Sequence, residues 1–597
     1  MKAVSADNSS PLKAWVRALE MTAPIERNPS VILPVMVEKL AGQFGPALAL
    51  IGDDECMTYR ELADQSNRYA RWALEQGIDA GRVVCLMMHN CPQYVAIWLG
   101  ITRIGGIVSL VNTNLAGGAL AHAINIVAPS QIIVGAELAG TVVDILPRLS
   151  SRVKTWVIGE SAHEFPRIDN ALDHYAGTSL SGLQFRAPSI SDLALYIYTS
   201  GTTGFPKAAN VSHFRLMQWS YWFAGLMNTQ STDRMLNCLP MYHSVGGVAA
   251  IFPVIINGGS VVIRPRFSSS RFWDDVASYD CTLFQYIGEL CRYLVNAPPH
   301  PRETDHRLRL CCGNGLRAGV WDEFKGRFRI PQILEFYAST EGNVSLYNCE
   351  GKPGAIGRVP SFLAHRSNLA LVKCDASTEA PLRNNDGFCA RCQPGEIGEA
   401  IGKILGDESD YTTRFEGYAD SAASERKILR DVFTHGDVWF RTGDLMRRDE
   451  KGYYYFVDRI GDTFRWKGEN VATVEVASKI SAYPHVLDAV VYGVTVPGTE
   501  GRAGMAAVVA DHGFELSAFH KYLNENLPDY ARPLFLRLCD VIEVTATFKS
   551  KAHQLKLDGY NPAATTDNIF FNDRLQQAFV KLDSTLFENI QAGMIRL

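Results

Sequence analysis

The stretch Leu193-Ala-Leu-Tyr-Ile-Tyr-Thr-Ser-Gly-Thr-Thr-Gly-Phe-Pro-Lys207 joins an apolar segment to a loop of glycines and hydroxyl side chains. The apolar and aromatic residues 193–198 are typical of a buried strand. Gly201 and Gly204 lack side chains, so the backbone after this strand can approach a ligand closely. Ligands in open α/β sheets lie beyond the carboxyl ends of the strands. The stretch therefore predicts a strand that ends at a binding site in an α/β fold.

The loop after this strand carries groups that can hold a polyphosphate. Its hydroxyl groups come from Thr199, Ser200, Thr202 and Thr203. Backbone N–H groups in such turns bind anions, and Lys207 adds a cation. The loop is not a Walker loop, which has four residues between its glycines and Ser or Thr after its lysine. Here two residues separate Gly201 from Gly204, and Ala208 follows Lys207. The alternative interpretation is a surface turn rich in Ser, Thr and Gly.

Composition limits the class of protein. A chain of 597 residues is too long for one hydrophobic core, so we expect several subdomains. Its 47% apolar and 20% charged residues are typical of a globular protein in solution. A formal net charge of −5 disfavours nucleic acid as the main partner. Thirteen scattered cysteines and no signal peptide favour the reducing cytoplasm.

No segment of the sequence makes a convincing membrane-spanning helix. The most apolar stretch, residues 248–263, contains Pro253 and Gly258, and we interpret it as a buried helix, a turn and a buried strand. Peripheral association with a membrane surface stays open, as does a homodimer. Cys389 and Cys392 form a CxxC pair without a matching second pair, so we expect no structural metal.

The first half of the chain predicts alternating helices and strands. Thr58 and Glu61 form a capping-box pattern that begins a helix, and Gly77 ends it. Short buried strands are expected at 83–88, 131–134 and 155–158. This alternation predicts a large N-terminal α/β domain of layered, largely parallel sheets with helices.

A shift in composition near residue 458 indicates a second, smaller domain. Residues 489–494 and 505–510 have strand character, and residues 517–527 have helix character. We therefore expect a small, mobile α+β C-terminal domain. The predicted division is a peripheral segment at 1–30, a nucleotide- and acyl-binding domain at 31–458, a hinge at 459–461 and a lid domain at 462–597.

Four further segments carry groups suited to a nucleotide or an acid. His243 lies at a glycine-flanked turn after a strand, and residues 312–316 form a turn with bare backbone. In the segment 335–343, the ring of Tyr337 can stack on a base and the hydroxyl of Thr340 can hold a phosphate oxygen. Glu341 can ligate Mg²⁺, which commonly needs only one or two carboxylates. Asp444 can accept hydrogen bonds from both hydroxyls of a ribose. Each segment alone is also compatible with a structural turn.

Taken together, these segments resemble a known family. The strings Thr199-Ser-Gly-Thr-Thr-Gly-Phe-Pro-Lys207, Tyr337-Ala-Ser-Thr-Glu341, Arg441-Thr-Gly-Asp444 and Asp458-Arg459 occur in the order found in acyl-adenylate-forming enzymes. That superfamily includes acyl-CoA synthetases, luciferases and peptide-synthetase adenylation domains. Gly313-Asn-Gly-Leu-Arg317 and Phe464-Arg-Trp-Lys-Gly-Glu-Asn470 are similar to the fatty-acid transport protein and very-long-chain acyl-CoA synthetase branch. Tyr530-Ala-Arg-Pro533 and Thr547-Phe-Lys549 fit the same branch.

The resemblance implies a role for each nucleotide-binding residue. The β- and γ-phosphates of ATP would be held by Thr199, Ser200, Gly201, Thr202, Thr203, Gly204 and Lys207. The adenine would lie against Gly313, Asn314 and Gly315, with Tyr337 stacked on it. Thr340 would contact the α-phosphate, Glu341 and Thr199 would hold Mg²⁺, and Asp444 with Arg459 would bind the ribose.

The resemblance also implies where the acid and CoA would bind. His243 would lie beside the carboxylate, in a tunnel near residues 243–251 and 288–294. Lys549 would be the catalytic lysine that the small domain brings to the site. Gly461 would be the hinge, at a position where many relatives have Asp or Lys. Arg465 and Lys467 are cations just after the hinge, and their position suits either CoA binding or a solvated charged loop. Ala338 departs from the family pattern, where glycine is usual.

The expected reaction is ATP-dependent activation of a carboxylic acid. Attack of the carboxylate on the α-phosphate makes an acyl-adenylate and releases pyrophosphate, and CoA then displaces AMP. The charge that develops on the phosphate is stabilised by cations and N–H donors. We expect a long-chain or very-long-chain fatty acid, with a sterol-side-chain or other hydrophobic acid as the alternative. An acyl-AMP ligase that loads a carrier protein, or a non-catalytic fatty-acid uptake protein, also stays open.

Overall fold

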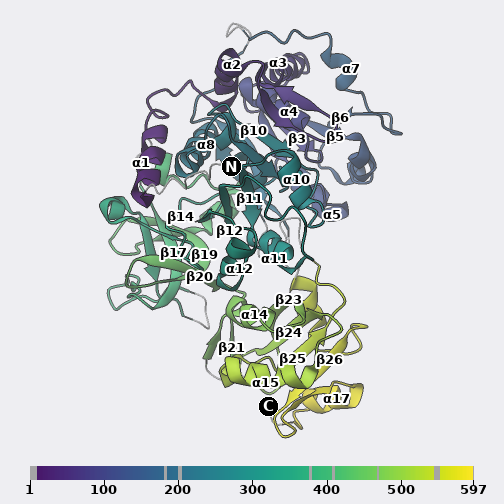
Figure 1. Ribbon diagram of the computed structural model, residues 1–597, viewed down its shortest axis with the longest axis vertical. Helices are drawn as coiled ribbons and strands as arrows, with labels where there is room; N and C mark the ends of the chain where they lie inside the picture. Colours follow the sequence, from purple (N-terminus) through teal and green to yellow (C-terminus); the bar gives the residue numbers. More distant parts are fainter. Residues whose placement is uncertain are drawn as a thin grey trace.

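The chain folds into a large N-terminal α/β domain and a smaller C-terminal domain (Figure 1). The computed structural model describes residues 10–180, 185–199, 205–375, 380–405, 411–466, 469–499, 501–543 and 552–595. Figure 1 shows the small domain at the end of the molecule that carries the C terminus, beside helices α11 (Gly288–Asn296) and α12 (Ala318–Arg327).

Helix α3 (Tyr59–Glu75) begins where the capping box predicted it. The backbone N–H of Glu61 donates to Thr58 Oγ1 at 3.2 Å, and the N–H of Thr58 donates to Glu61 Oε2 at 2.8 Å. These two bonds satisfy N–H groups that the first turn of a helix leaves unpaired. Just past the helix end, Gly77 has a φ of +72°, a left-handed conformation that favours glycine.

The strand that leads into the predicted phosphate loop lies in a six-stranded sheet. All neighbouring strands in this sheet are parallel except the last pair, β7 and β8. In spatial order the strands are β6 (Lys154–Ile158), β5 (Gln131–Gly135), β3 (Val83–Met87), β4 (Ile107–Leu110), β7 (Leu193–Thr199) and β8 (Lys207–Ser212). The expected strands at 83–88, 131–134, 155–158 and 193–198 are confirmed within a residue or two.

A second, 14-stranded sheet has a parallel half and an antiparallel half. The parallel half runs through β13 (Gln332–Ala338), β12 (Leu310–Asn314), β11 (Leu283–Ile287), β9 (Arg234–Asn237), β10 (Ser260–Ile263) and β1 (Leu48–Ile51), with β2 (Cys56–Thr58) antiparallel at the edge. The antiparallel half contains β14 (Ser345–Asn348), β15 (Gly357–Arg358), β20 (Tyr453–Arg459), β19 (Val438–Arg448), β17 (Ile397–Ile404) and β16 (Leu369–Val372). A short strand, β18 (Ile428–Arg430), pairs with β19. The binding segments predicted from the sequence lie in or just after these strands.

The apolar stretch 248–263 is buried and does not form one long helix. It contains the end of a π-helical turn (Val245–Ala249), the short helix α9 (Phe252–Ile255) and strand β10. This agrees with the predicted helix, turn and strand. Among the helices that the structure describes, none combines the length and apolar character needed to cross a membrane.

The N-terminal segment corrects one expectation. We expected residues 1–30 to be peripheral, but helix α1 (Pro11–Thr22) packs on α8 (His213–Met227) and belongs to the main core. Trp15 is 6% exposed, and its ring lies 5.7 Å from that of Trp222. A Cβ on Gly225 would lie 2.4 Å from Ala18 Cα, so glycine is needed for this contact. Alternating polar residues and prolines concealed the buried stripe of the helix.

The C-terminal domain has its own sheet and its own hydrophobic cluster. In spatial order its strands are β23 (Val486–Val494), β24 (Ala503–Ala510), β25 (Phe535–Leu538), β26 (Asn568–Asp573) and β27 (Ala578–Lys581). Helices α14 (Thr473–Ser481) and α15 (Leu516–Asn526) belong to the same cluster. A two-stranded ribbon, β21 (Phe464–Trp466) and β22 (Glu469–Val471), precedes them. The expected strands near 489–494 and 505–510 and the helix near 517–527 are confirmed, with ends shifted by up to three residues.

Candidate functional site

The predicted phosphate loop lies between two paired strands. Thr199 is the last residue of β7, Lys207 is the first of β8, and the two are directly opposite each other. Ser200, Gly201, Thr202, Thr203 and Gly204 lie outside the described residues. The antiparallel pairing brings Thr199 and Lys207, the two ends of the loop, to one place at the carboxyl end of β7.

Glu341, the predicted magnesium ligand, is oriented by a tyrosine. The hydroxyl of Tyr418 donates to Glu341 Oε1 at 2.8 Å, and Glu341 is 8% exposed. Burial, followed by the negative charge of Glu341, raises the pKa of Tyr418, so the phenol stays protonated as a donor. The ammonium of Lys207 lies 5.5 Å from the centre of the Tyr418 ring. One carboxylate is enough for Mg²⁺ when phosphate oxygens and water supply the other ligands, so this arrangement fits the ion.

An arginine from α8 holds the loop that carries Thr340 and Glu341. Arg215 Nη1 donates to the carbonyl oxygens of Thr340 at 2.6 Å and Gly342 at 3.0 Å. Arg215 is 6% exposed, and its Nε lies 3.6 Å from Glu416. The side chain therefore fixes the backbone on both sides of Glu341. On the same loop, the hydroxyl oxygen of Thr340 lies 3.1 Å from that of Ser244, next to the predicted acid-binding His243.

The predicted ribose and adenine residues meet in space. The hydroxyl of Tyr337 donates to Asp444 Oδ2 at 2.5 Å, across 107 positions in the sequence. Asp444 and Arg459 are paired across β19 and β20, and Arg459 Nε lies 3.5 Å from Asp444 Oδ1. Burial and the neighbouring Asp444 charge raise the pKa of Tyr337, which remains a hydrogen-bond donor. The Tyr337 ring, expected to stack on adenine, is thus tied to the carboxylate expected to bind ribose.

A buried glutamate organises the turn that was predicted to contact adenine. Glu335 accepts from the backbone N–H groups of Gly315 at 2.5 Å and Leu316 at 3.1 Å, and from the Tyr286 hydroxyl at 2.5 Å. Burial raises the pKa of Glu335 to about 8, while these three donors act in the opposite direction. A Cβ on Gly313 would lie 2.2 Å from the carbonyl oxygen of Tyr286. Contact between β11 and β12 therefore requires glycine at position 313, whatever binds there.

His243 and Ser244 lead into the π-helical turn. The backbone N–H of Gly247 donates to the His243 carbonyl oxygen at 2.7 Å, and the Tyr242 and His243 rings lie 4.7 Å apart. π-Helical turns inside proteins are frequent at functional sites. The two segments predicted to line an acid tunnel meet at Val245. Val248 lies in the main core and Leu290 of α11 lies in another cluster, and Val245 packs against both.

The residues predicted to form a hinge connect β20 to the small domain. Gly461 has a φ of +90°, in the left-handed region that favours glycine. Just before it, the Asp458 carboxylate accepts from Thr473 N at 2.5 Å and Thr473 Oγ1 at 2.9 Å, which ties the strand to α14. Arg465 is exposed on β21. Lys467 and Lys549, the predicted CoA-binding and catalytic lysines, lie outside the described residues.

The two domains also meet at an ion pair. Arg292 of α11 lies with its Nη2 3.0 Å from Asp488 Oδ1 of β23. Arg292 Nη1 donates to the carbonyl oxygen of Leu487, and Arg292 Nε lies 2.7 Å from Glu289 Oε2. A single side chain of the large domain thus contacts both charge and backbone of the small domain.

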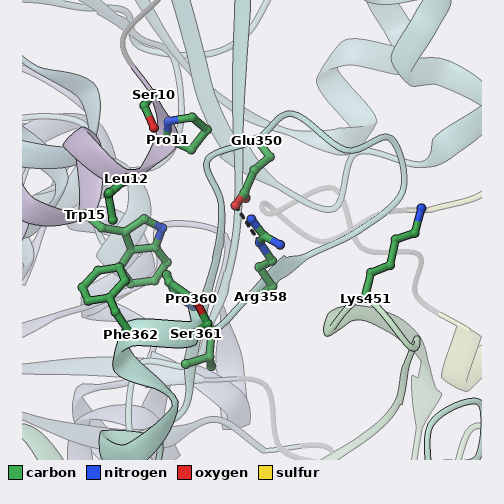
Figure 2. A pocket seen from close by; sticks show the side chains of 11 residues that line it. Ser10, Pro11, Leu12, Trp15, Glu350, Arg358, Pro360, Ser361, Phe362 and Lys451 are labelled. Carbon is green, nitrogen blue, oxygen red and sulfur yellow. Dashed lines mark hydrogen bonds and ion pairs between the residues drawn. The ribbon is translucent and has the colours of Figure 1, made fainter.

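A surface pocket lies away from these residues (Figure 2). It encloses about 300 Å³ between α1 and the segment 358–362, and Figure 2 shows the Arg358–Glu350 ion pair in its wall. Arg358 Nε and Glu350 Oε1 are 2.6 Å apart. The pocket includes none of the residues predicted to bind nucleotide, acid or CoA.

Sequence reasoning missed several residues that shape the site. They are Arg215, Glu335 as a turn acceptor, Tyr418 and Arg292. Each of them contacts a partner that is distant in the sequence or lies in an irregular loop. Hydrophobic periodicity reports only regular local structure, so it could not predict these contacts. Tyr418 follows a glycine just before a short helix, α13 (Ser421–Glu425), and that turn was the one local cue.

Two family models match the chain. The model described as "AMP-binding enzyme" matches residues 37–397, and the model described as "AMP-binding enzyme C-terminal domain" matches residues 475–549. The first match contains Thr199, Lys207, Tyr337 and Glu341, and the second ends at Lys549.

Curated proteins are similar to this one over nearly the whole chain. Long-chain fatty acid transport protein 1 of Mus musculus is 39% identical over 567 residues, which cover 94% of this chain and 88% of the relative. Long-chain fatty acid transport protein 6 of Homo sapiens is 38% identical over 558 residues, covering 92% of this chain and 88% of the relative.

Solved structures share the fold. An anthranilate CoA ligase, AuaEII, in complex with anthranoyl-AMP superposes with a TM-score of 0.76 at 21% identity, covering 90% of this chain and 98% of that chain. A fatty acyl CoA synthetase of Mycobacterium tuberculosis gives a TM-score of 0.61 at 21% identity, with 88% and 98% coverage. At these identities the likeness shows the fold.

Proposed function

Because the chain belongs to the AMP-binding enzyme family, in its branch of long-chain fatty acid transport proteins, we propose that it is an ATP-dependent acyl-CoA synthetase. Membership makes it an acyl-adenylate ligase that uses ATP. We propose further that its acid is a long-chain or very-long-chain fatty acid and that CoA accepts the acyl group. One observation carries the proposal: residues of separate motifs converge, as in the 2.5 Å hydrogen bond from Tyr337 to Asp444.

The first half-reaction forms a mixed anhydride. A carboxylate oxygen of the acid attacks the α-phosphorus of ATP, the bond to the bridging oxygen breaks, and pyrophosphate leaves with its electron pair. Thr340, whose backbone carbonyl is held by Arg215, would donate to the phosphate, and Lys207 would hold the leaving pyrophosphate. Lys549 would complete the set of cations when the small domain brings it to the site. Donors fixed in advance around the developing charge lower the barrier.

Glu341 and Thr199 would hold Mg²⁺, which supplies positive charge to the phosphate oxygens when it is bound. The part played by this chain is to orient the ligand. The Tyr418 hydroxyl donates to Glu341 Oε1, so Oε2 would be the oxygen offered to the metal. Asp444 and Arg459 would bind the ribose and so fix the position of the nucleotide relative to Glu341.

The acid would enter beside Ser244 and the π-helical turn. His243 would lie next to its carboxylate, and the apolar residues after it would line the chain. Residues 243–251 share the main core with β13, and Val245 also packs against the cluster that contains Leu290, so both tunnel segments expected from the sequence stay in the proposal. The names of the curated relatives support a long-chain acid.

In the second half-reaction, the CoA thiol attacks the acyl carbon and AMP leaves. We propose that the small domain turns about Gly461 between the two steps, removing Lys549 and bringing Arg465 and Lys467 toward CoA. The φ of +90° at Gly461 supports a hinge, because glycine tolerates large backbone changes.

The test uses the purified protein with ATP, Mg²⁺ and a panel of acids of different chain length. Acid-dependent exchange of pyrophosphate into ATP reports the first step, and acyl-CoA with AMP reports the whole reaction. Lys549→Ala should abolish the exchange, whereas Lys521→Ala, an exposed lysine on α15, should leave it unchanged. Exchange at the wild-type level in Lys549→Ala would contradict the role of that lysine.

Two other functions have separate outcomes in the same experiments. A stable product without CoA, or acyl transfer only to a carrier protein, would replace the CoA synthetase with an acyl-AMP ligase. The relatives' names also favour fatty-acid uptake. Uptake that persists in cells carrying both Glu341→Gln and Lys549→Ala would identify a transport function without catalysis.

A further inference from the structure

Lys427 is a cation in the candidate nucleotide site, and the proposed mechanism assigns no role to it. It lies between α13 and β18, and its backbone carbonyl accepts from Arg441 N at 2.8 Å. Its Nζ donates to the carbonyl oxygen of Thr442 at 3.0 Å, two residues before Asp444. A Cβ on Gly443 would lie 3.3 Å from this Nζ. The ammonium is therefore held against the turn that carries Asp444.

Each of the three carboxylates around Lys427 has another side chain as a partner. Glu341, Asp444 and Glu399 are close enough to raise its pKa, and Lys207 is close enough to lower it. Glu399 is bound by Arg441 at 2.7 Å, Asp444 by Tyr337, and Glu341 by Tyr418. Within the described part of the chain, Nζ has no carboxylate at ion-pairing distance, and its one hydrogen bond goes to a backbone carbonyl.

A half-buried ammonium without a direct anionic partner is costly. Burial is the largest effect on Lys427 and lowers its pKa. An anion delivered by a ligand would satisfy the donors that Thr442 leaves and recover this cost. The position of Lys427 indicates which anion would bind. The residue lies near Lys207, which is assigned to the distal phosphates, and near Asp444, which is assigned to the ribose. The α-phosphate is the group between those two parts of ATP.

We propose that Lys427 binds the α-phosphate of the nucleotide, and that it does so in both half-reactions. The inference rests on the proposed function, since it assumes that the nucleotide is bound as the family motifs imply. Lys427 belongs to the large domain, so it stays at the site when Lys549 moves with the small domain. The two lysines then divide the work, with Lys549 serving only adenylate formation and Lys427 holding the phosphate throughout.

The first test compares AMP with adenosine, which differ by the phosphate that Lys427 is proposed to bind. Calorimetry on the full-length protein should show AMP binding about ten- to a hundredfold weaker in Lys427→Met, the usual effect of losing a charge-assisted hydrogen bond. Adenosine binding should be unchanged. Lys427→Arg should retain most of the AMP affinity, and Lys451→Met, an exposed lysine outside the site, should match the wild type.

A structural role would give a different pattern. If Lys427 only supports the Thr442 turn, AMP and adenosine binding should fall by the same factor. Lys427→Gln keeps a neutral donor for the Thr442 carbonyl and controls for a folding defect in Lys427→Met. AMP binding equal to wild type in both variants, or equal losses for AMP and adenosine, would overturn the proposal. Wild-type protein that does not bind AMP would instead overturn the proposed function.

The second test separates the two half-reactions. Protein supplied with ready-made acyl-adenylate and CoA skips the first step. Lys427→Met should then form acyl-CoA at least about tenfold more slowly than wild type at limiting adenylate, because phosphate binding is still needed. Lys451→Met, the exposed control outside the site, should react at the wild-type rate. Normal thioester formation by Lys427→Met would show that this lysine does not hold the adenylate in the second step.

Discussion

Asp488→Asn tests whether the ion pair between α11 and β23 holds the small domain in the arrangement seen here. The substitution keeps the size of the side chain and removes its charge. Arg292 remains bound to Glu289 and to the Leu487 carbonyl oxygen, so the large domain keeps its local structure. The variant therefore weakens the contact between the domains while both side chains stay in place.

The expected size of the effect follows from the geometry. Arg292 Nη2 and Asp488 Oδ1 are 3.0 Å apart, and the two side chains are 8% and 20% exposed. Two unit charges at that separation attract by roughly 5 kcal/mol at an effective dielectric constant of about 20. Desolvation offsets most of this, because burial raises the pKa of Asp488 even though Arg292 lowers it. We expect a net loss of about 1–2 kcal/mol, a shift of about 5–30-fold in the equilibrium between domain arrangements.

The assay is the distance between domains in solution. Dye-bearing noncanonical residues at Lys325 of α12 and Lys521 of α15, both exposed, avoid the thirteen native cysteines. Energy transfer should report a larger population of other arrangements in Asp488→Asn and Arg292→Gln than in wild type. Asp511→Asn is the matched control, because Asp511 pairs with His485 at 2.9 Å inside the small domain.

Asp488→Asn should also affect the two half-reactions unequally. Whichever half-reaction uses this arrangement should slow, while the other should hold or accelerate. An unchanged distance distribution in both interdomain variants would refute the role of the ion pair. An equal fall in both half-reactions would refute it as well, since a shift between two arrangements cannot slow both.

Three further predictions concern the site itself. Because the folded pKa of Glu335 is raised to about 8, its favourable contribution is present below about pH 4.5 and is lost as the pH rises through 8. Wild type should therefore lose up to about 4 kcal/mol relative to Glu335→Gln between pH 5 and 8, seen in melting temperatures, and a pH-independent difference would contradict this. Tyr418→Phe frees Glu341 and should raise the Mg²⁺ concentration for half-maximal pyrophosphate exchange by about 5–30-fold, whereas an unchanged Mg²⁺ curve would remove its positioning role. Tyr337→Phe keeps the ring but frees Asp444, so the KM for ATP should rise by about 3–10-fold with the KM for acid unchanged, and an unaltered KM for ATP would count against the contact.

Local signals predicted the regular elements well. The capping box of Thr58 and Glu61 located the start of α3, and apolar runs located β3, β5, β6 and β7. These features depend on contacts within a few residues, or on burial that repeats along one element. Helix α1 shows the limit of such signals, because its buried stripe depends on the glycine that α8 presents to Ala18.

The candidate site was only partly predictable. Motif order identified Tyr337, Glu341 and Asp444 as a group, but it could not reveal that Tyr337 donates to Asp444. Tyr418 lies 77 positions from Glu341, and Arg215 lies 125 positions from Thr340. No period or spacing in a single sequence records such pairs. They arise because folding pairs the segment after β17 with β8, where Tyr418 lies opposite Ala209, and brings α8 against the loop after β13.

The sequence by itself determined the family, the order of the motifs and the chemical groups available for ATP. It did so because strands, turns and motif strings are written in neighbouring residues. Only the tertiary structure decided which of those groups touch, and therefore which carboxylates already have partners. In the sequence, Lys427 is an ordinary lysine before a short strand. Folding brings Glu399, Glu341 and Asp444 close to it, and each of these carboxylates already binds another side chain. Electrostatic attraction acts through space, so the candidate phosphate contact emerges only when these distant segments are brought together.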